Sequence, residues 1–250
     1  MKRVAVIPAH DEEGTVGEVA LKAGRHVDLV IVVDDGSSDR TATIAREAGA
    51  EVVELQPNRG KGGALEVGIA RALEVGAEQV VTLDADGEHD PDAIPLFLQA
   101  LEEADVALGW REVYRSGARQ ALNRFALFFF QLLDPAIRDS ICGFRAFRAT
   151  ALPAVRNDAG GFSYEHEVIL RAVAGHLKLA SVPVQTVPRT RTHVRTRDLV
   201  GANNHFDRWV LGHLRDLPLP AWRKALLAAG CVAGLATGAP VEWALSRRSA

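Results

Sequence analysis

Cysteine is scarce in this sequence: only Cys142 and Cys231 occur among 250 residues. The two lie far apart among apolar or small residues, and a chain of this length buries enough surface to fold without a disulfide or a structural metal. A disulfide-stapled fold is therefore excluded. We expect two buried thiols in a protein of a reducing compartment.

The sequence also lacks a charge excess and a long apolar run at its start. Its 29 basic and 32 acidic residues give a formal net charge of −3, which offers no electrostatic basis for binding nucleic acid. Met1-Lys2-Arg3 leads into an apolar run that His10 ends, too short for a secretory signal. These absences predict a cytoplasmic protein that does not bind nucleic acid.

One uncharged segment, Ala225–Val241, lies between Arg223-Lys224 and Arg247-Arg248. It is rich in alanine and glycine and contains Pro240, so it is a weak candidate for a membrane span. A packed or interfacial helix is the better interpretation. An interfacial helix would place the chain peripherally at the cytoplasmic face of a membrane.

The first half of the chain alternates short apolar runs with amphipathic stretches, which is typical of βα units on a mostly parallel sheet. The expected strands are Val4–Ile7, Leu29–Val33, Val52–Leu55, Val80–Leu83 and Val106–Leu108. The expected helices are Thr15–Ala23, Thr41–Ala48, Ala64–Leu73 and Ile94–Leu101. Polar clusters follow three of the strands, and open α/β sheets bind ligands beyond the carboxyl ends of their strands. These clusters therefore predict a single site.

The second half has a different pattern. A phenylalanine-rich helix is expected near Asn123–Leu133, a second helix at Tyr164–Ala174 and a strand at Leu177–Val184. No repeat or low-complexity linker separates the two halves, so the second half is expected to complete the site.

The length predicts one large α/β domain rather than two independent ones. We place this domain at residues 1–200, with a first half up to about residue 110 and a second half over 111–200. Helices over 201–250 are expected to follow it.

Two carboxylates, Asp84 and Asp86, flank Ala85 directly after an apolar strand. Mg2+ and Mn2+ prefer carboxylate oxygen and keep coordination positions open for substrate phosphates, whose charge they neutralise. Glu88 adds another oxygen two residues further on. The alternative is an acidic turn that only caps the next helix, a role that Asp90-Pro91-Asp92 fits well. Asp84, Asp86 and Glu88 are thus the candidate ligands of Mg2+ or Mn2+.

Two more polar segments follow strands or precede helices. Asp34-Asp35-Gly36-Ser37-Ser38-Asp39 is either a structural turn or a carboxylate pair that binds a base or ribose. Asn58-Arg59-Gly60-Lys61-Gly62-Gly63 precedes an expected helix and resembles a phosphate cradle. It lacks the GxxxxGK[ST] pattern, and Leu65 stands where GxGxxG has its last glycine. An ATPase P-loop and a Rossmann dinucleotide site are both disfavoured.

Taken in order, four motifs resemble those of family 2 glycosyltransferases of the GT-A fold: Ile7–Glu13, Val33–Thr41, Asn58–Leu65 and Asp84–Asp86. Further along, similarity to the dolichol-phosphate mannosyltransferase branch is carried by Leu108–Arg111 and Asp139–Arg148. The resemblance spans about residues 3–197. It implies a single Rossmann-like GT-A domain, with a mostly parallel sheet flanked by helices and a helical, basic acceptor lobe. It also implies a nucleotide-sugar donor, a divalent cation and a lipid-phosphate acceptor.

The resemblance implies roles for individual residues. The expected donor-binding set comprises the positions that hold the base, ribose and diphosphate: Pro8, Ala9, His10, Glu12, Asp35, Lys61, Asp84, Ala85 and Asp86. The expected catalytic set adds basic residues near the acceptor phosphate and an acid before the Gly-Phe turn: Asp86, Arg111, Arg119 and Asp139. This sequence departs from the family in having His10 where tyrosine is usual and Glu88 where glutamine is frequent.

Basic residues alternate with threonine or valine from Arg189 to Arg197. If this segment is extended, all of them share one face, and guanidinium groups bind phosphate in bidentate fashion. Arg191 and Arg195 therefore join the expected donor-binding set. The alternative is a solvated edge strand that its charges protect from aggregation.

These observations favour inverting transfer of a hexose from a donor of the GDP-mannose or UDP-glucose type to a polyprenyl phosphate. The anionic phosphate oxygen would need no strong base, whereas a hydroxyl acceptor would need one, for which Asp139 and Glu165 are candidates. Two other classes remain open: a nucleotidyltransferase, and a catalytically silent module that binds nucleotide sugars. A nucleotidyltransferase would be expected to carry its glycine-rich loop nearer the first strand.

Overall fold

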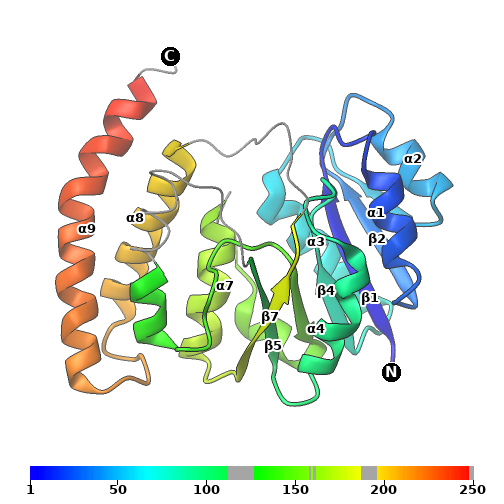
Figure 1. Cartoon of the computed structure of the whole chain (residues 1–250). Helices are drawn as coiled ribbons and strands as arrows, with labels where there is room; N and C mark the ends of the chain where they lie inside the picture. Colours follow the sequence, from blue (N-terminus) through cyan, green and yellow to red (C-terminus); the bar gives the residue numbers. More distant parts are fainter. Residues whose placement is uncertain (112–126, 158, 160–161, 187–195, 248–250) are drawn as a thin grey trace.

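A mixed sheet forms the centre of the computed structural model, which describes residues 1–111, 127–157, 159, 162–186 and 196–247. Within these residues the sheet has seven strands in the order β3-β2-β1-β4-β6-β5-β7 (Figure 1). The strands are β1 (Arg3–Ala9), β2 (Leu29–Asp34), β3 (Glu51–Glu54), β4 (Gln79–Thr82), β5 (Val106–Arg111), β6 (Arg145–Arg148) and β7 (Leu179–Val184). Only β6 among them runs antiparallel to its neighbours, so the predicted α/β fold with a mostly parallel sheet is confirmed.

Helices connect these strands and cover both faces of the sheet. They are α1 (Val16–Ala23), α2 (Thr41–Glu47), α3 (Gly60–Glu74), α4 (Ile94–Ala100), α6 (Leu152–Val155), α7 (Phe162–Ala174), α8 (Thr196–His213) and α9 (Ala221–Arg247). A further helical stretch covers 127–133, and short 3-10 turns lie at η1 (Pro91–Ala93) and η2 (Ala149–Ala151). In η1 the side chain of Asp90 accepts a hydrogen bond from the amide of Asp92, so the predicted cap is present.

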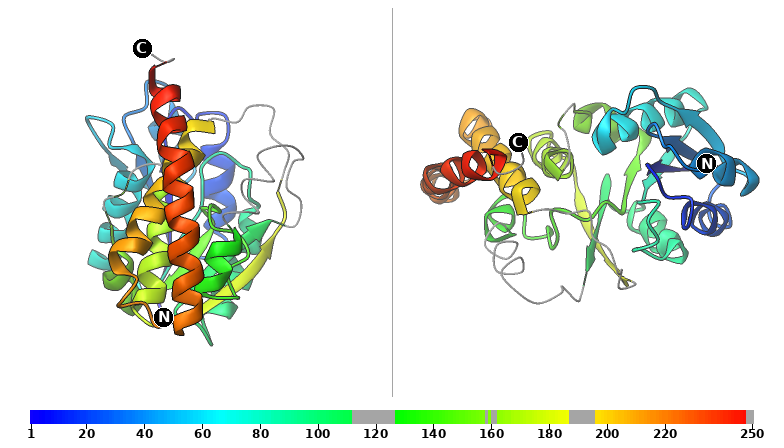
Figure 2. Two further views of the ribbon diagram at one scale, coloured as in Figure 1. Left: turned by 90° about the vertical axis from the view of Figure 1, so that its left-hand side faces the viewer. Right: turned by 90° about the horizontal axis from the view of Figure 1, so that it is seen from above.

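The sheet divides the apolar interior into two layers. Alternate residues of β1 point to opposite faces, as strand geometry requires: Val4 and Val6 belong to the apolar layer that includes α3 and α7, whereas Ala5 and Ile7 belong to the layer that includes α1 and α4. The view from above in Figure 2 shows the sheet between these helices. The carboxyl ends of β1, β2 and β4 therefore share one edge, where the predicted polar clusters meet.

The helix expected to start at Ala64, after the glycine-rich segment, starts four residues earlier than predicted. Helix α3 begins at Gly60, so Lys61, Gly62 and Gly63 form its first turn. Glycine at position 62 permits close packing: a Cβ there would lie 2.5 Å from the carbonyl oxygen of Ala159. A Cβ on Gly68, further along the helix, would overlap side chains of β1 and β2.

The C-terminal helices lie side by side at the edge of the molecule remote from α1 and α2 (Figures 1 and 2). The uncharged segment Ala225–Val241 is helical within α9, as predicted. Leu227 and Cys231 are buried in it, whereas Trp222 and Leu226 are exposed. Among the residues that the structure describes, none of the helices has both the length and the apolar character to span a bilayer.

The basic segment Arg189–Arg197 is described only at its end. Because α8 begins at Thr196, Arg197 is helical, and the prediction of an extended backbone is wrong at that residue. Residues 187–195, which include Arg191 and Arg195, lie outside the described part of the chain.

The two cysteines and the phenylalanine-rich helix have the environments expected for packing residues. Cys142 and Cys231 are free and buried, which confirms the predicted thiols. Phe130 is fully buried against His166 and Phe206, whereas Phe128 is exposed.

An acid is buried between α8 and α9. Asp207 is 9% exposed, and the absence of a Cβ at Gly234 leaves room for its carboxylate. Burial raises the pKa of Asp207 to about 6, against the opposing effect of a hydrogen bond from Cys231. The ionised form is thus disfavoured in the folded state, and stability from this group is complete at acidic pH and is lost as the pH rises through about 6.

Replacing Asp207 by asparagine should therefore stabilise the chain at neutral pH. At about 1.4 kcal/mol per pKa unit, we expect the free energy of unfolding to rise by about 1–3 kcal/mol at pH 7.5 and to change little at pH 4. Thermal and urea denaturation at both pH values measure this. Asp216→Asn, at an exposed position after α8, is the control and should change neither value. Equal effects of Asp207→Asn at both pH values would contradict the assignment.

Candidate active site

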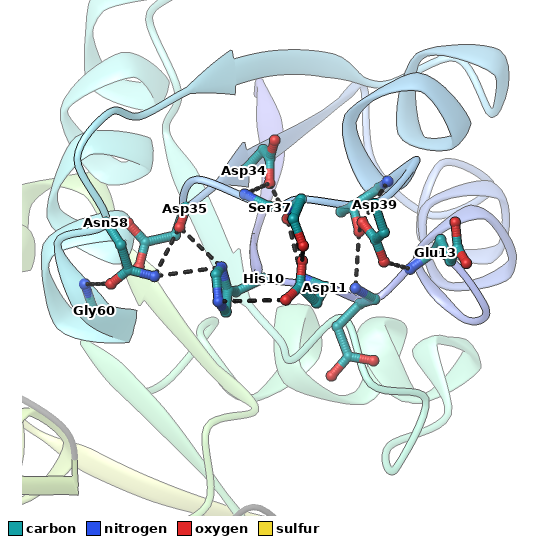
Figure 3. A network of polar contacts seen from close by, with 12 residues as sticks. His10, Asp11, Glu13, Asp34, Asp35, Ser37, Asp39, Asn58 and Gly60 are labelled. Carbon is teal, nitrogen blue, oxygen red and sulfur yellow. Dashed lines mark hydrogen bonds and ion pairs between the residues drawn. The ribbon is translucent and has the colours of Figure 1, made fainter.

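The end of β2 is tied to the loop before α3. Asp35 is 4% exposed; its carboxylate accepts a hydrogen bond from the amide of Arg59 at 2.7 Å, and its carbonyl oxygen accepts one from the side chain of Asn58 at 2.8 Å. The Nδ1 atom of His10 lies 3.0 Å from the same carbonyl oxygen (Figure 3). Gly36 follows with a φ of 74°, a conformation that glycine adopts without strain. The predicted base-pocket residues His10 and Asp35 therefore lie together.

A second set of contacts joins the loop after β1 to the loop after β2. The amide of Glu12 donates to the hydroxyl of Thr41 at 2.8 Å, and the amide of Glu13 donates to Asp39 at 3.1 Å. The carboxylate of Asp11 accepts the amide of Ser38 at 2.8 Å. Pro8 and Ala9 are buried at the end of β1 beneath these loops. The acids of the Asp34–Asp39 segment thus build the loop itself, the structural alternative considered for them, while Asp35 still borders His10.

Lys61 joins the two halves of the chain. Its ammonium nitrogen lies 2.7 Å from Oδ1 of Asp84, which follows β4, and 2.8 Å from Oε1 of Glu165 in the first turn of α7. Burial alone would lower the pKa of Lys61, but attraction to Asp84 and Glu165 outweighs it and the pKa is raised. The same charge lowers the pKa of Asp84 against the opposing effect of burial. Lys61 and Asp84 are therefore both ionised near neutral pH.

Gly143 provides the space for this ion-pair cluster. A Cβ at this position would lie 2.7 Å from both Oδ2 of Asp84 and Nζ of Lys61, closer than side chains normally approach. The carbonyl oxygen of Gly143 accepts a hydrogen bond from the hydroxyl of Thr82 at 3.1 Å, which holds the loop against β4. A Cβ at this position would therefore require the Asp84 carboxylate and the Lys61 ammonium to shift.

Arg111 forms the second ion-pair system, at the end of β5. Its Nε and Nη2 atoms donate to the two carboxylate oxygens of Asp139 at 2.8 and 3.2 Å, and Nη1 lies 3.5 Å from Oε1 of Glu88. The carboxylate of Asp139 is almost fully buried and also accepts the amide of Ile141 at 3.0 Å. Burial acts to lower the pKa of Arg111, but Asp139 outweighs it and the pKa is raised. Arg119, expected beside Arg111, lies outside the described residues.

The predicted three-carboxylate metal site is not preformed. Within the described part of the chain, no group of three or more histidine, cysteine, aspartate or glutamate side chains is arranged to hold a metal ion. The reason is local, since Asp84 contacts Lys61 and Glu88 faces Arg111. The carboxylate of Asp86 accepts the amide of Glu88 at 2.9 Å. Asp84 and Asp86 nevertheless retain ionised or hydrogen-bonded carboxylates at the strand end, the donor chemistry that a hard cation prefers.

Two buried residues near the site are not predicted by the sequence pattern. Arg145 of β6 is 3% exposed and donates to the carbonyl oxygens of Ser140, Cys142 and Glu165 at 2.8–3.1 Å. His89 is also 3% exposed and lies 3.7 Å from the sulfur of Cys142. The only sequence signal for Arg145 is its place in the Asp139–Arg148 motif, whereas His89 carries none.

The sequence was compared with protein families and with characterised proteins. The model of Glycosyl transferase family 2 matches residues 4–156, more than half of the chain. The chain is 30% identical over 211 residues to the UDP-N-acetylglucosamine–dolichyl-phosphate N-acetylglucosaminyltransferase of Methanococcus voltae, a match that covers 73% of this chain and 84% of the relative. It is 31% identical over 188 residues to the dolichyl-phosphate hexose transferase of Haloferax volcanii, covering 72% and 80%.

A solved structure shares the fold. Glucosyl-3-phosphoglycerate synthase from Mycobacterium tuberculosis, crystallised with Mn2+, UDP and glucosyl-3-phosphoglycerate, superposes with a TM-score of 0.66 at 22% identity. The match covers 88% of this chain and 81% of that one. The sheet, the order of motifs and the family match agree, and the chain therefore belongs to glycosyltransferase family 2 and has the GT-A fold.

Proposed function

We propose that this enzyme is a metal-dependent, inverting glycosyltransferase that moves a hexose from a GDP-mannose or UDP-glucose type donor to a polyprenyl phosphate. The observation that carries the proposal is the contact of Lys61 with Asp84 at the carboxyl edge of the sheet, beside Arg111. Such an edge can hold a diphosphate on one side and an acceptor phosphate on the other. The names of the Methanococcus voltae and Haloferax volcanii relatives support a lipid-phosphate acceptor.

The donor half supplies binding and charge compensation. Pro8, Ala9, His10, Glu12 and Asp35 would border the nucleoside, since they surround the ends of β1 and β2. Lys61 would face the diphosphate as a point charge, because its ammonium is fixed at the strand edge. Negative charge grows on the diphosphate as the sugar bond breaks, and a fixed cation stabilises that state more than the ground state.

Two of the three predicted carboxylate ligands are suitably placed to bind a divalent cation. Asp84 and Asp86, on either side of buried Ala85, would hold Mg2+ or Mn2+, and the ion when bound would neutralise charge on the leaving diphosphate. Glu88, the third predicted ligand, faces Arg111 and stays a prediction. The Mycobacterium tuberculosis structure was crystallised with Mn2+ and UDP, which supports this choice of ion.

The acceptor half supplies cations for the second phosphate. Arg111 would orient the phosphate, and its bidentate partner Asp139 fixes the guanidinium plane. Arg119 stays a prediction for the same role, and Arg191 and Arg195 stay predictions as donor-binding residues. A polyprenyl phosphate oxygen is already anionic near pH 7, so it would attack the anomeric carbon from the face opposite the leaving diphosphate without a strong base.

We further propose that the domain covers residues 1–200, that α9 meets the membrane from the cytoplasmic face, and that the halves divide near residue 110. Exposed Trp222 and Leu226 on α9 support the contact with lipid.

The family match excludes the nucleotidyltransferase alternative. Transfer to a soluble or polysaccharide hydroxyl stays as the second acceptor class.

Sugar transfer from radiolabelled donors tests the proposal. With UDP-glucose, UDP-N-acetylglucosamine or GDP-mannose, we expect label in an organic-soluble product only when polyprenyl phosphate and Mg2+ or Mn2+ are both present. EDTA and Asp86→Ala should each reduce the product at least tenfold, whereas Asp92→Ala, at an exposed position in the same loop, should not. Product formed only on soluble hydroxyl acceptors would refute the lipid-phosphate acceptor, and equal donor turnover by wild type and Asp86→Ala would refute the metal assignment.

A further inference from the structure

Glu165 is a deeply buried acid where the two halves meet. The residue is 1% exposed, and its carboxylate points at Lys61 with an N–O distance of 2.8 Å. Apart from that ammonium, no donor in the described part of the chain hydrogen-bonds either carboxylate oxygen. The backbone beside it is fixed, because its carbonyl oxygen accepts a hydrogen bond from Arg145 at 2.8 Å. Glu165 is thus a rigid negative charge whose described partner is Lys61.

The cluster carries one positive and two negative charges. Asp84 and Glu165 approach Lys61 from different elements, β4 and α7, and the ammonium is 2.7 and 2.8 Å from them. A buried carboxylate is costly without a counter-charge, so Glu165 strongly disfavours any conformation in which Lys61 leaves it. Asp84, in contrast, is 25% exposed at its side chain and open to a ligand.

Because Glu165 is buried and Asp84 is partly exposed, the two acids have different roles. When a ligand engages Asp84, the ammonium keeps its buried partner and stays at the strand edge. Without Glu165, Lys61 would have Asp84 as its sole partner among these two acids. A ligand of either residue would then have to compete with the Lys61–Asp84 ion pair. Glu165 therefore affects the affinity of the site for a diphosphate without contacting the diphosphate itself.

We propose that Glu165 is a positioning residue that anchors the Lys61 ammonium, so that Lys61 faces the donor diphosphate while Asp84 is left free to engage the donor side of the site. This inference rests on the proposed function, since it assumes that a nucleoside diphosphate group binds beside Lys61. It differs from the role of general base for a hydroxyl acceptor, because a base must reach the acceptor, whereas this side chain is only 2% exposed and its Oε1 atom contacts Lys61.

Binding of UDP and GDP to the full chain, measured by calorimetry without acceptor, tests the anchor. We expect Glu165→Gln to weaken the binding of the nucleotide that the wild type prefers by about tenfold, and Lys61→Met to weaken it at least as much. Because Glu165 acts through Lys61, the double variant should bind no more weakly than Lys61→Met. In transfer assays, Glu165→Gln should raise the KM for the donor more than it lowers kcat.

Glu167→Gln is the matched control. Glu167 is a buried acid on the same helix, but it pairs with Arg171 and His205 rather than with Lys61. Its loss should lower thermal stability while leaving nucleotide affinity unchanged. A further readout separates anchoring from general destabilisation: adding Glu165→Gln to Lys61→Met should raise the melting temperature, because it removes a buried charge that has lost its partner.

The outcomes separate the two hypotheses. Unchanged nucleotide affinity in Glu165→Gln with a large fall in kcat would refute the anchor and indicate a general base. Losses that multiply in the double variant would also refute it, since they show that Glu165 acts independently of Lys61. If the wild type binds neither UDP nor GDP, the proposed function fails and the anchor fails with it.

Discussion

Replacing Asp84 by asparagine is expected to lower kcat/KM for sugar transfer by about 10²–10³-fold. The carboxylate lies two residues after the end of β4, contacts Lys61 at 2.7 Å and lies within the glycosyltransferase family 2 match. Asparagine keeps the shape but removes the charge, so it would lose both the attraction to Lys61 and most of its affinity for a hard cation. Initial rates with labelled donor, measured across donor and Mn2+ concentrations, give the effect.

The loss should arise from function rather than unfolding. In Asp84→Asn, Lys61 keeps its contact with Glu165, so the buried charges balance and the melting temperature should change by only a few degrees. Asp92→Asn is the control, since that exposed acid pairs with His26 and belongs to the same loop. A kcat/KM within threefold of wild type for Asp84→Asn would show that the strand end does not form the donor site.

The strands and the site edge can be read from the sequence because both are local signals. Buried strands appear as short runs of valine, isoleucine and leucine, and polar residues directly after such runs must lie at the carboxyl edge of a parallel sheet. This pattern alone locates His10, Asp35 and Asp84 at that edge. It does not identify β6 as a strand, since Arg145–Arg148 has only four residues and carries arginine at both ends.

The glycine-rich segment shows why composition alone misleads. Gly62 and Gly63 resemble a phosphate loop because glycine allows a backbone to approach a ligand. In the structure glycine serves a different close approach: Gly62 lets α3 pack against Ala159 and Tyr164. The residue type is the same in both cases, and only the tertiary neighbours distinguish them.

Contacts between the halves cannot be predicted from local patterns. Lys61 and Glu165 lie in different helices far apart in sequence, and nothing near either residue specifies the other. The sequence pattern leaves Glu165 as a candidate base for a hydroxyl acceptor, whereas the structure shows its carboxylate against an ammonium. Because Lys61 and Glu165 are far apart in sequence, local patterns cannot predict their contact, which sets the charge balance of the site.

The segment from Asp139 to Arg145 connects the two ion-pair systems. Asp139 binds Arg111 on the proposed acceptor side, and four residues later Gly143 borders Asp84 and Lys61 on the proposed donor side. Arg145 holds the segment by donating to two of its carbonyl oxygens and to that of Glu165. A displacement at one end of this segment would therefore disturb both ion-pair systems, and with them both proposed phosphate sites.

Asp139→Asn is the sharpest test of that link. The substitution removes the charge that pairs with Arg111 through two hydrogen bonds, and breaking a buried pair typically costs about 3–5 kcal/mol. We expect a lower melting temperature and a fall in kcat/KM of about 10²-fold or more, with the KM for polyprenyl phosphate raised because Arg111 loses its orientation. Asp134→Asn, a partly buried acid that precedes the same segment, is the control and should retain activity.

The pH profile of Asp139→Asn distinguishes orientation from base catalysis. If Asp139 orients Arg111 and the acceptor is a phosphate, the residual activity should keep the wild-type shape between about pH 6 and 9, because no proton leaves an attacking hydroxyl. If Asp139 were the base, residual activity should instead rise with hydroxide concentration across that range. Measuring kcat/KM at several pH values, at a temperature where the variant stays folded, separates the two. A rise in residual activity with hydroxide concentration would show that Asp139 accepts the proton of the attacking hydroxyl. It would also refute the proposal that the acceptor is a phosphate.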